Sequence, residues 1–552
     1  MAMNERYDVC VYGATSGGVV AAVALARKGF SVALVEPTRH VGGMSSGGLG
    51  WTDGGCTEKI GGLSAAFYRE VAAYYQAQGV SEEASRNGGL GWSHEPHVAE
   101  AIFQRWLREA GVEPLFACRV AEVRKDGRRI TAVVVDQAEP DARGAPAPKP
   151  DVPGFATILA RMFIDASYEG DLLALAGVST TTRREGRDQY GEDMAGIIYH
   201  HHETLDGKLL HPPGLDTAAL DVDPYVVPGD PSRGLLPLLE EHEPYPPGHA
   251  DDALQAYNFR LCLTADPDNT VPIEPVGAYD PRWFELLGRW LAKLESDGDP
   301  IRPGHFHHFG LNPLRVFKIS PLPHDKSDVN NAHSFLSSDF VGQNYAYPGA
   351  DWARRAGIWQ AHEDYQRGLH YFMQTDARVP PEVREESGRW GLARDEFKDT
   401  GHWPFQLYVR ESRRMIGDLV MTQNHVNRSL KVDDSIGMGS YSLDSHLCRR
   451  FVYQGRVINE GGFLFRNGRQ AYPISYRALL PKETECENLA SLFCVSASHA
   501  AFSTLRMEPV LMILGQSVAS AIEMALEQGL PLARIPVPTL QVRLLDEGQI
   551  II

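Results

Sequence analysis

The chain has 552 residues, of which 43% are hydrophobic and 9% aromatic, so it can bury a large core and form more than one domain. Its formal net charge of −18 at pH 7 excludes an extended basic footprint, and we expect no binding to nucleic acid or to anionic membranes. The seven cysteines are scattered without a C-x-x-C pair and predict reduced thiols rather than a disulfide framework.

Residues 7–36 are predicted to form a strand, a glycine turn, a helix and a second strand that ends in an acid. Gly13 permits the tight turn into the helix, Gly29 ends the helix, and Gly18 lets it pack close to the sheet. Glu36 ends the unit, where a carboxylate can accept hydrogen bonds from an adenosine ribose while the helix N-terminus faces a pyrophosphate. This pattern predicts a nucleotide-binding βαβ unit.

The glycine fingerprint of this unit is incomplete, because Thr15 stands where the G-x-G-x-x-G pattern has its second glycine. A threonine hydroxyl can still bond a phosphate. The alternative is an ordinary βαβ unit whose glycines only make the turn. The strand, helix and acid around the glycines favour nucleotide binding.

A glycine-rich loop follows at residues 41–53, with the sequence VGGMSSGGLGWTD. Its five glycines let the backbone approach a large flat ligand and offer many N–H donors. A nicotinamide enzyme has no need of such a loop. Placed just after the ribose acid, it resembles the loop of FAD-dependent oxidoreductases of the glutathione-reductase-type superfamily, where it runs along the ribityl chain and pyrophosphate. The resemblance implies FAD as the cofactor.

Further along the chain, helices are predicted over 61–78 and 95–111, and strands over 119–136 and 155–165. The proline- and alanine-rich segment 139–154 lies between the last two strands and predicts a mobile surface hairpin connection.

From residue 180 to residue 468 the composition shifts to His, Pro, Tyr and Trp, with predicted helices over 283–294 and 352–372. We interpret this segment as a substrate-facing insertion.

The last part of the chain is expected to return to the first domain. Residues 488–500 predict a buried strand that leads into small residues, and 509–527 predict a long apolar helix opened by proline. In flavoproteins of the resembled type, that helix points its positive end at the flavin. The predicted fold is therefore α/β, a Rossmann-like FAD-binding domain with an inserted α+β substrate domain. The predicted boundaries are 1–180 and 469–552 for the two parts of the FAD-binding domain and 181–468 for the insertion.

Seven stretches carry a wider resemblance: GATSGGVVAA, HVGGMSSGGLGWTD, IDASYEGDLLALAGV, QAYNFRLCLT, LYVRESRRMIGDLVMT, YPISYRALLPK and SASHAAFSTLRMEPVLMILGQSVA. Together they are similar, over nearly the full length, to the bacterial FAD-dependent oxidoreductase family that is distantly related to fumarate reductase and succinate dehydrogenase flavoproteins. The resemblance implies fold and cofactor more strongly than reaction. The residues expected to bind FAD are Gly13, Thr15, Ser16, Gly17, Gly18, Glu36, Gly42, Gly43, Met44, Gly47, Gly48, Ala166, Ser498 and Pro509.

The candidate catalytic residues begin with segment 496–509, which lies between the returning strand and the flavin-facing helix and contains His499 and Arg506. Imidazole is near neutral in pKa and can remove an alcohol or amine proton while hydride leaves to flavin N5. Fumarate-reductase-type proteins also carry a His and an Arg in this region, although at a different spacing. The alternative is that His499 only bonds the flavin or a carbonyl.

A cluster of arginines forms the second candidate, with Arg410, Arg413 and Arg414 in the stretch LYVRESRRMIG. Planar guanidinium groups can clamp a carboxylate or sugar hydroxyls. We expect at least one of these arginines to form an internal salt bridge with Glu411 or Asp418, and Arg410 to face the ligand.

Other histidines suggest two further roles, covalent attachment of flavin and metal binding. His40 precedes the glycine loop, and a histidine can attach flavin covalently in related flavoproteins, although nothing in the spacing requires it here. The runs 200–202 and 305–308 are rich in histidine, but no cysteine or acidic partner is suitably spaced, so we predict no metal.

The sequence therefore predicts an FAD-dependent oxidoreductase that oxidises a small polar organic substrate, hydroxylated or sugar-like, by hydride transfer to flavin N5. The electron acceptor is unidentified, and the oligomeric state is open. Two alternatives remain: a flavin-dependent reductase of an activated double bond, and an FAD-binding redox-sensing or structural protein. No run approaches about 18 apolar residues, and a strand is predicted close to the N-terminus, so we predict a cytoplasmic protein.

Overall fold

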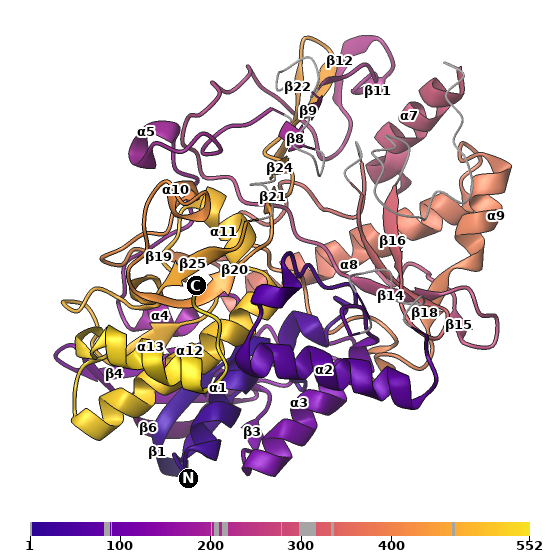
Figure 1. Ribbon diagram of the computed structural model, residues 1–552. Coiled ribbons are helices and arrows are strands. Elements are labelled where there is room, and N and C mark those ends of the chain that lie inside the picture. The colour runs from indigo at the N-terminus through magenta and orange to yellow at the C-terminus, as the bar shows by residue number, and fades with distance from the viewer. Residues whose placement is uncertain are drawn as a thin grey trace.

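The structure is a computed structural model that describes residues 3–81, 89, 91–199, 201–203, 209–211, 219–277, 279–296, 316–332, 336–465 and 470–552. In Figure 1 the first and last parts of the chain, indigo and yellow, lie together around one sheet at the lower left, while the middle of the chain forms the upper and right-hand parts. The mixed α/β architecture with parallel strands confirms the predicted fold class. Whether residues 181–468 form an inserted domain stays a prediction.

The main sheet has seven strands among the described residues, in the order β3-β2-β1-β6-β5-β4, with β26 also pairing with β6. Its strands are β1 (Met3–Tyr12), β2 (Val32–Val35), β3 (Pro114–Leu115), β4 (Cys118–Asp126), β5 (Arg129–Gln137), β6 (Val152–Asp165) and β26 (Leu489–Ser491). β1 runs parallel to β2 and β6, whereas β4 and β5 form an antiparallel extension. The carboxyl ends of β1, β2 and β6 therefore meet at one edge, where ligands bind in open α/β sheets.

Strand β6 is shared along one side by two partners. β5 pairs with its first part, up to Leu159, and β26 pairs with Phe163–Asp165 at its carboxyl end. The buried side chain of Asn488 fills the gap between them, accepting from the Ile130 N–H at 2.9 Å and donating to the carbonyls of Ile130 and Arg161, both at 2.9 Å. The C-terminal segment is thereby fixed to the nucleotide-binding half of the sheet.

Helices α1 (Ser16–Arg27) and α12 (Glu508–Gln528) pack with their backbones in direct contact. A Cβ atom on Gly17 would lie 2.7 Å from the Leu511 carbonyl oxygen, and one on Gly515 would lie 2.3 Å from the Gly17 carbonyl oxygen. Only glycine fits at these two positions. α12 is long and apolar enough to cross a membrane, but 94% of its apolar window is buried inside the protein, as expected for a core helix.

The other helices around the main sheet are α2 (Gly62–Ala77), α3 (Pro96–Ala110), α4 (Asp171–Leu175), α11 (His499–Leu505) and α13 (Val537–Asp546). The short 3-10 helices are η1 (Gly43–Ser45), η2 (Thr57–Lys59), η4 (Pro281–Phe284), η5 (Lys398–Thr400), η6 (Tyr476–Leu479) and η7 (Leu532–Arg534). The helices predicted over 61–78 and 95–111 are confirmed as α2 and α3. The strand predicted over 488–500 is shorter, because only three residues of β26 reach β6 before the chain turns into α11.

The described residues in the middle of the chain form a five-stranded sheet in the order β15-β18-β14-β17-β16, several smaller sheets and two helices of 12 or more residues. The helices of this part are α5 (Arg187–Tyr190), α7 (Glu285–Ser296), α8 (Trp352–Thr375), α9 (Pro381–Arg389) and α10 (Gln423–Val426). The five-stranded sheet consists of β14 (Leu261–Thr264), β15 (Thr270–Val271), β16 (Phe317–Pro321), β17 (Lys326–Asn331) and β18 (Gly391–Ala393). The helices predicted over 283–294 and 352–372 are confirmed as η4 with α7 and as α8.

Short strands complete this part and belong to smaller sheets. They are β7 (Thr180–Thr181), β8 (His201–Glu203), β9 (Leu209–His211), β10 (Ala219–Leu220), β11 (Tyr225–Val227), β12 (Asp230–Leu235), β13 (Glu240–Glu241), β19 (Arg414–Met415), β20 (Ser435–Gly439), β21 (Leu443–Ser445), β22 (Arg449–Tyr453), β23 (Arg456–Glu460), β24 (Phe463–Phe465) and β25 (Tyr472–Ser475).

The proline-rich connection at residues 139–154 joins β5 to β6 as predicted, but it is packed against the protein rather than free. Ala145 is buried, Arg119 donates to the Ala147 carbonyl at 2.7 Å, and Arg143 donates to the Gln360 side chain on α8. Prolines and alanines fill the space between the sheet and α8, which local composition alone does not reveal.

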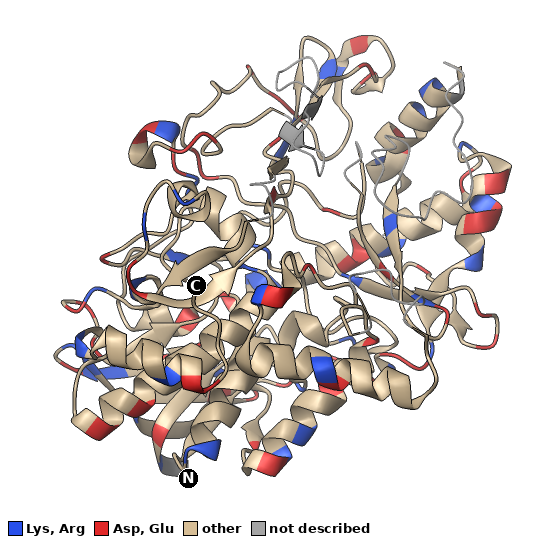
Figure 2. Cartoon of the chain, in the orientation of Figure 1, with Lys and Arg blue, Asp and Glu red and all other residues tan. Residues whose placement is uncertain are grey.

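Charged residues of both signs are interspersed on the outer elements, as on α2 and α9 in Figure 2. The excess of acidic residues is therefore spread over the molecule. No stripe of Lys and Arg is visible along the described helices in this view.

Helix α8 buries two histidines, His362 and His370, and burial lowers the pKa of His362 to about 4 and that of His370 to about 3. Nδ1 of His362 donates to the Ile358 carbonyl at 2.7 Å, and among the described residues its Nε2 has no partner. Both rings are therefore neutral in the folded protein and charged in the unfolded chain below its pKa near 6.5. Their contribution to stability is full above that pKa and is lost as the pH falls toward 4.

We predict that His362→Gln reduces this acid sensitivity. Between pH 7 and pH 5 the free energy of unfolding of the wild type should fall by about 2 kcal/mol more than that of the variant, measured from thermal melts at the two pH values. His242→Gln, at an exposed histidine, is the control and should melt like the wild type at both values. Equal losses for wild type and His362→Gln would contradict the assignment.

Candidate active site

A cleft opens at the carboxyl ends of β1, β2 and β6. Its floor is made by the turns that follow these strands, and its walls come from the 140–146 connection, from α8 and from residues 405–407. The residues that line it are Gly13, Thr15, Glu36, Pro37, Thr38, His40, Gly43, Pro140, Gly144, Pro146, Ser167, Tyr168, Glu169, Tyr347, Trp352, Trp359, Phe405, Gln406 and Leu407. Its position is that of a nucleotide site in a doubly wound sheet.

Gly13 and Glu36 shape the floor of this cleft together. Gly13 has φ = +96°, and a Cβ atom there would lie 2.7 Å from the backbone nitrogen of Ser167. The Glu36 carboxylate accepts from the backbone N–H groups of Ala14 at 2.6 Å and Thr38 at 2.8 Å, and burial raises its pKa. Glu36 therefore braces the glycine turn and also lines the cleft, as the ribose-binding prediction requires.

The predicted binding residues around the first turn of α1 fall into two groups, those that line the cleft and those that pack inside the protein. Thr15 caps the helix, with its hydroxyl accepting from the Gly18 N–H at 3.3 Å and donating to the Ala166 carbonyl at 2.8 Å, and it lines the cleft. Gly17 contacts α12, and a Cβ atom on Gly18 would lie 2.0 Å from the Gly13 carbonyl oxygen. These two glycines and Ala166 are used for packing within the protein, and a direct role in binding stays a prediction.

The glycine loop is held against the cleft by its own backbone. Gly42 has φ = +98° and donates to the Ala14 carbonyl at 2.7 Å, while Gly43 has φ = +56° and lines the cleft. Gly47 leaves no room for a side chain beside Gln406, and Gly48 has φ = +124°. The Met44 N–H donates to the Tyr168 hydroxyl at 2.7 Å. The predicted close approach of backbone to cofactor is thus available at Gly42 to Gly43.

Glu508, the first residue of α12, meets the first residue of α1 behind the cleft. Its buried carboxylate accepts from the hydroxyls of Ser16 at 2.6 Å, Ser45 at 2.9 Å and Tyr168 at 3.0 Å, and burial raises its pKa. Tyr168 itself lines the cleft. The next residue, Pro509, lies in the first turn of α12. A direct role of Ser16 and Pro509 in binding stays a prediction.

His499 is the first residue of α11, where Ser498 caps the helix and donates to Glu192 at 2.6 Å. Its Nδ1 lies 2.8 Å from the Glu411 carboxylate, and its Nε2 lies 3.4 Å from the Ser445 hydroxyl. Burial opposes ionisation of Glu411, but contacts with His499 and Arg414 outweigh burial and lower the pKa of Glu411 to about 2. An ionised Glu411 favours the tautomer with the proton on Nδ1, which leaves Nε2 as a proton acceptor.

The three predicted arginines have different partners. Arg410 is buried, its guanidinium lies 2.9 Å from Asp339 and 3.0 Å from the Asn258 amide oxygen, and burial lowers its pKa. Arg413 pairs with Asp171 at 2.8 Å. The internal salt bridge predicted within this stretch is confirmed for Arg414, which lies 2.9 Å from Glu411 and also pairs with Glu185. Arg410 is thus already neutralised by a carboxylate, and its contact with a ligand stays a prediction.

Arg506 and Arg410 meet on the same tyrosine. Arg506 donates to the Tyr408 hydroxyl at 2.8 Å and to the Asp444 carbonyl at 2.9 Å, and the Arg410 guanidinium lies 4.5 Å from the centre of the Tyr408 ring. His446 lies 2.6 Å from Asp339, the partner of Arg410. The structure therefore brings His499, Arg410 and Arg506 into one buried network around β21, next to Gln406 and Leu407 in the cleft wall.

Sequence reasoning missed most of the partners in this network, namely Asp339, Tyr408 as a ligand of Arg506, Ser445, His446 and the pairing of Glu411 with His499. The one signal in the sequence was Glu411, the acid between Arg410 and Arg414, for which the sequence analysis predicts only a salt bridge and not the contact with His499. The remaining partners come from segments far apart in the chain.

The other histidines are placed as follows. His40 lines the cleft, stacks on Phe405 with ring centres 3.9 Å apart, and lies 3.0 Å from Glu100 and 3.2 Å from Asp399. A covalent link from His40 to flavin stays untested. His200 and the histidines of 305–308 lie outside the described residues.

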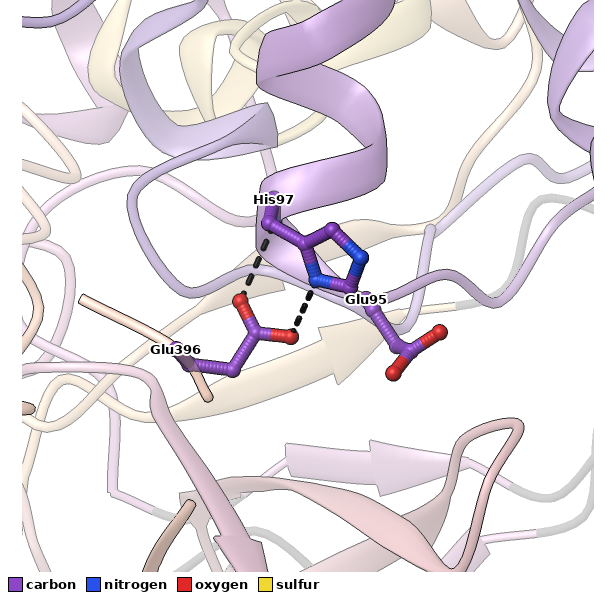
Figure 3. A group of neighbouring side chains, drawn as sticks. All are labelled: Glu95, His97 and Glu396. Atoms are coloured by element: carbon purple, nitrogen blue, oxygen red, sulfur yellow. Dashed lines mark hydrogen bonds and ion pairs between the residues drawn. The ribbon is translucent and has the colours of Figure 1, made fainter. Parts of the chain in front are cut away.

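One described group of side chains has the composition of a metal site. Figure 3 shows Glu95, His97 and Glu396 gathered at the start of α3. The ammonium group of buried Lys326, however, lies 2.6 Å from Glu95 and 2.8 Å from Glu396. The lysine supplies the positive charge that the two carboxylates need, so the group is explained as a buried ion-pair cluster. The prediction that the protein binds no metal stays a prediction.

Comparison with known proteins assigns the family. The model of the FAD dependent oxidoreductase family matches residues 8–544. The chain belongs to this family. It is therefore an FAD-dependent oxidoreductase, an enzyme with FAD as its cofactor, as predicted. No curated protein matches the chain.

Several solved structures are similar to parts of the chain. The OxyS anhydrotetracycline hydroxylase from Streptomyces rimosus is 14% identical, with 33% of this chain and 38% of that one covered and a TM-score of 0.22. L-amino acid deaminase from Proteus vulgaris is 14% identical, with 36% and 55% covered and a TM-score of 0.22. THI4 from Thermovibrio ammonificans is 18% identical, with 33% and 66% covered and a TM-score of 0.22. The matched part spans less than two thirds of each of these proteins.

The residues of the cleft fit FAD. Glu36 lines the floor, where its carboxylate would accept from ribose hydroxyls, and the turn from Gly13 to the capped α1 would face a pyrophosphate with its backbone N–H groups.

We predict that Glu36→Ala weakens FAD binding about 10- to 100-fold, because it removes a charged hydrogen-bond acceptor for the ribose and for two backbone N–H groups. Flavin fluorescence during titration of the FAD-free protein gives the dissociation constant. Glu36→Gln keeps an acceptor oxygen and should lie between wild type and Glu36→Ala. An unchanged affinity in Glu36→Ala would remove this residue from the site.

Proposed function

We propose that the enzyme oxidises a small polar organic molecule, hydroxylated or sugar-like, with His499 taking the proton that leaves the substrate. The observation that supports this most is the buried His499–Glu411 pair, which directs Nε2 away from the carboxylate. In this proposal the residues of the cleft would hold FAD, which would supply the hydride acceptor at flavin N5.

Proton removal is the step that the chain itself performs in this proposal. Glu411 orients the imidazole and stabilises the positive charge that His499 gains when it accepts a proton. Ser445 lies at Nε2 and passes the proton or yields its place to the substrate hydroxyl. Both His499 and Glu411 are at most 1% exposed, so water does not compete for the proton.

The surrounding network positions the substrate. Arg506 and Tyr408 offer hydrogen-bond donors, and the Arg410 guanidinium packs on the Tyr408 ring, 4.5 Å from its centre. We include in this proposal that residues 181–468 act as a substrate-facing insertion and that the fold belongs to the glutathione-reductase-type superfamily. The electron acceptor that reoxidises the flavin is unidentified, and the cytoplasmic location stays a prediction.

A second candidate function is the reduction of an activated double bond. It is favoured by one observation, the buried guanidinium of Arg506 in the same network as His499. In that reaction Arg506 would deliver a proton to one carbon of the double bond, and the other carbon would receive a hydride from the reduced flavin. A third candidate, an FAD-binding redox-sensing or structural protein, would need no such network.

Anaerobic mixing with a panel of metabolites separates these candidates. Bleaching of the oxidised flavin by a hydroxylated compound supports the oxidation, whereas reoxidation of the reduced flavin by an unsaturated compound supports the reductase. No reaction in either direction with any class of compound would contradict both enzymatic proposals.

We predict that His499→Ala keeps FAD but slows flavin reduction by about a hundredfold or more, with a smaller loss at high pH, where the substrate ionises unaided. Glu411→Gln should slow the reaction about tenfold, because it removes the charge that stabilises the protonated imidazole. Rapid-mixing absorbance at the flavin band measures both rates. If His499→Ala reacted as fast as the wild type, another base would have to be sought.

A further inference from the structure

We infer that Arg506 and Tyr408 form an anion-binding subsite and that the substrate is a small hydroxylated carboxylate. This inference rests on the proposed oxidation, because it names the substrate class of the same site. It is carried by a buried cation without a close counter-charge. Arg506 is only 4% exposed, yet no described carboxylate oxygen lies within 4.0 Å of its guanidinium, and the carboxylates of Asp444 and Asp53 act on it only from farther away.

Most of the other buried arginines are paired with a carboxylate. Six of them, among the residues that the structure describes, have a carboxylate oxygen at 2.9 Å or less: Arg184, Arg260, Arg355, Arg367, Arg410 and Arg414. Arg119 lacks a close carboxylate, but its guanidinium lies 5.0 Å from the Trp352 ring and donates to the Ala147 carbonyl. Arg506 has no such close carboxylate, although it belongs to the same network as His499.

The Arg506 guanidinium donates two hydrogen bonds, and both go to neutral oxygens, the Tyr408 hydroxyl and the Asp444 carbonyl. Its Nε is buried and has no partner in the described part of the chain. A buried guanidinium that lacks a counter-charge is costly, and a carboxylate that accepts two of its N–H groups removes that cost. The Nε of Arg410 is also without a partner, but Arg410 has a carboxylate at 2.9 Å, so it is the lack of a close carboxylate at Arg506 that points to an anionic ligand.

Tyr408 supplies a second donor beside it. Its hydroxyl oxygen accepts from Arg506, and among the described residues no acceptor takes the hydrogen of that hydroxyl. A carboxylate at this point can accept from Arg506 and from Tyr408 together. The Arg410 guanidinium lies 4.5 Å from the centre of the ring, which fixes the orientation of the tyrosine.

The position of this subsite relative to His499 limits the size of the substrate. Arg506 binds the backbone of Asp444, and His499 faces the side chain of the next residue, Ser445. Consecutive Cα atoms are about 3.8 Å apart, so the anion site and the proton acceptor serve neighbouring groups of one small molecule. A 2-hydroxy carboxylate has its acid and its alcohol on adjacent carbons, as this spacing requires.

The inference is tested by anion binding, which requires no turnover. The FAD-loaded protein is titrated with glycolate and, as a neutral counterpart, ethylene glycol, while the flavin absorbance spectrum is recorded. We expect glycolate to perturb the spectrum with a dissociation constant of about 1–10 mM and ethylene glycol to have no effect. Arg506→Gln should weaken glycolate binding at least about 100-fold, and Arg506→Lys should weaken it less, because a charge remains.

Two further variants serve as controls. Tyr408→Phe keeps the ring but removes the hydroxyl, and should weaken glycolate binding about tenfold even if Arg506→Gln fails to fold. Arg354→Gln, at an exposed arginine on α8, should bind glycolate like the wild type.

Glycolate that leaves the spectrum unchanged, or that binds Arg506→Gln as tightly as the wild type, would overturn the inference. Flavin reduction by a neutral polyol without any glycolate effect would also overturn it and would leave the proposed oxidation standing. Conversely, Arg506-dependent glycolate binding without flavin reduction by any compound would support the subsite and contradict the oxidation.

Discussion

The pairing of β26 with the carboxyl end of β6 is the constraint on which the site depends. Three residue pairs join these strands, and Asn488 closes the gap to β5 with bonds to Ile130 and Arg161. Without this pairing, α11 and α12 would have no fixed position relative to the glycine turn at Gly13. With it, a segment almost 500 residues away in sequence is placed beside the nucleotide cleft.

The packing of α12 on α1 places the candidate catalytic residues beside the cleft. The backbone contact at Gly17 and Gly515 brings the first turns of the two helices together, where Glu508 bonds Ser16. Just before that turn, α11 presents His499 at its start and Arg506 at its end. The positions of His499, Arg506 and the cofactor cleft are thus set by one helix contact and one strand pairing.

Each arginine of the network except Arg506 lies close to a carboxylate. Glu411 serves both His499 and Arg414, and Asp339 serves both Arg410 and His446. Such shared carboxylates hold their neighbours in fixed positions without access to water. Arg506 alone in this network lacks a close carboxylate among the described residues, and that imbalance distinguishes a subsite from a structural ion pair.

Much of the fold could be predicted from the sequence, because its signals are local. The βαβ unit, Glu36, the glycine loop and the apolar helix after Pro509 each depend on residues within one or two turns of chain. The catalytic network could be predicted only in part. His499 and Arg506 were found because they stand next to a recognisable helix, whereas Glu411 pairs with His499 across 88 residues and Asp339 with His446 across 107.

Such long-range pairing leaves no periodicity for a sequence pattern to reveal. For the same reason the segment 139–154 was expected to be free, although Arg143 and Ala147 attach it to α8 and to the sheet.

A crystal structure of the FAD-loaded protein with glycolate tests the central claim most directly. The account predicts the flavin ring beside Tyr408, with the glycolate carboxylate within hydrogen-bond distance of Arg506 and its hydroxyl directed toward His499. A flavin ring that faces away from this network, with glycolate bound elsewhere or not at all, would contradict the account.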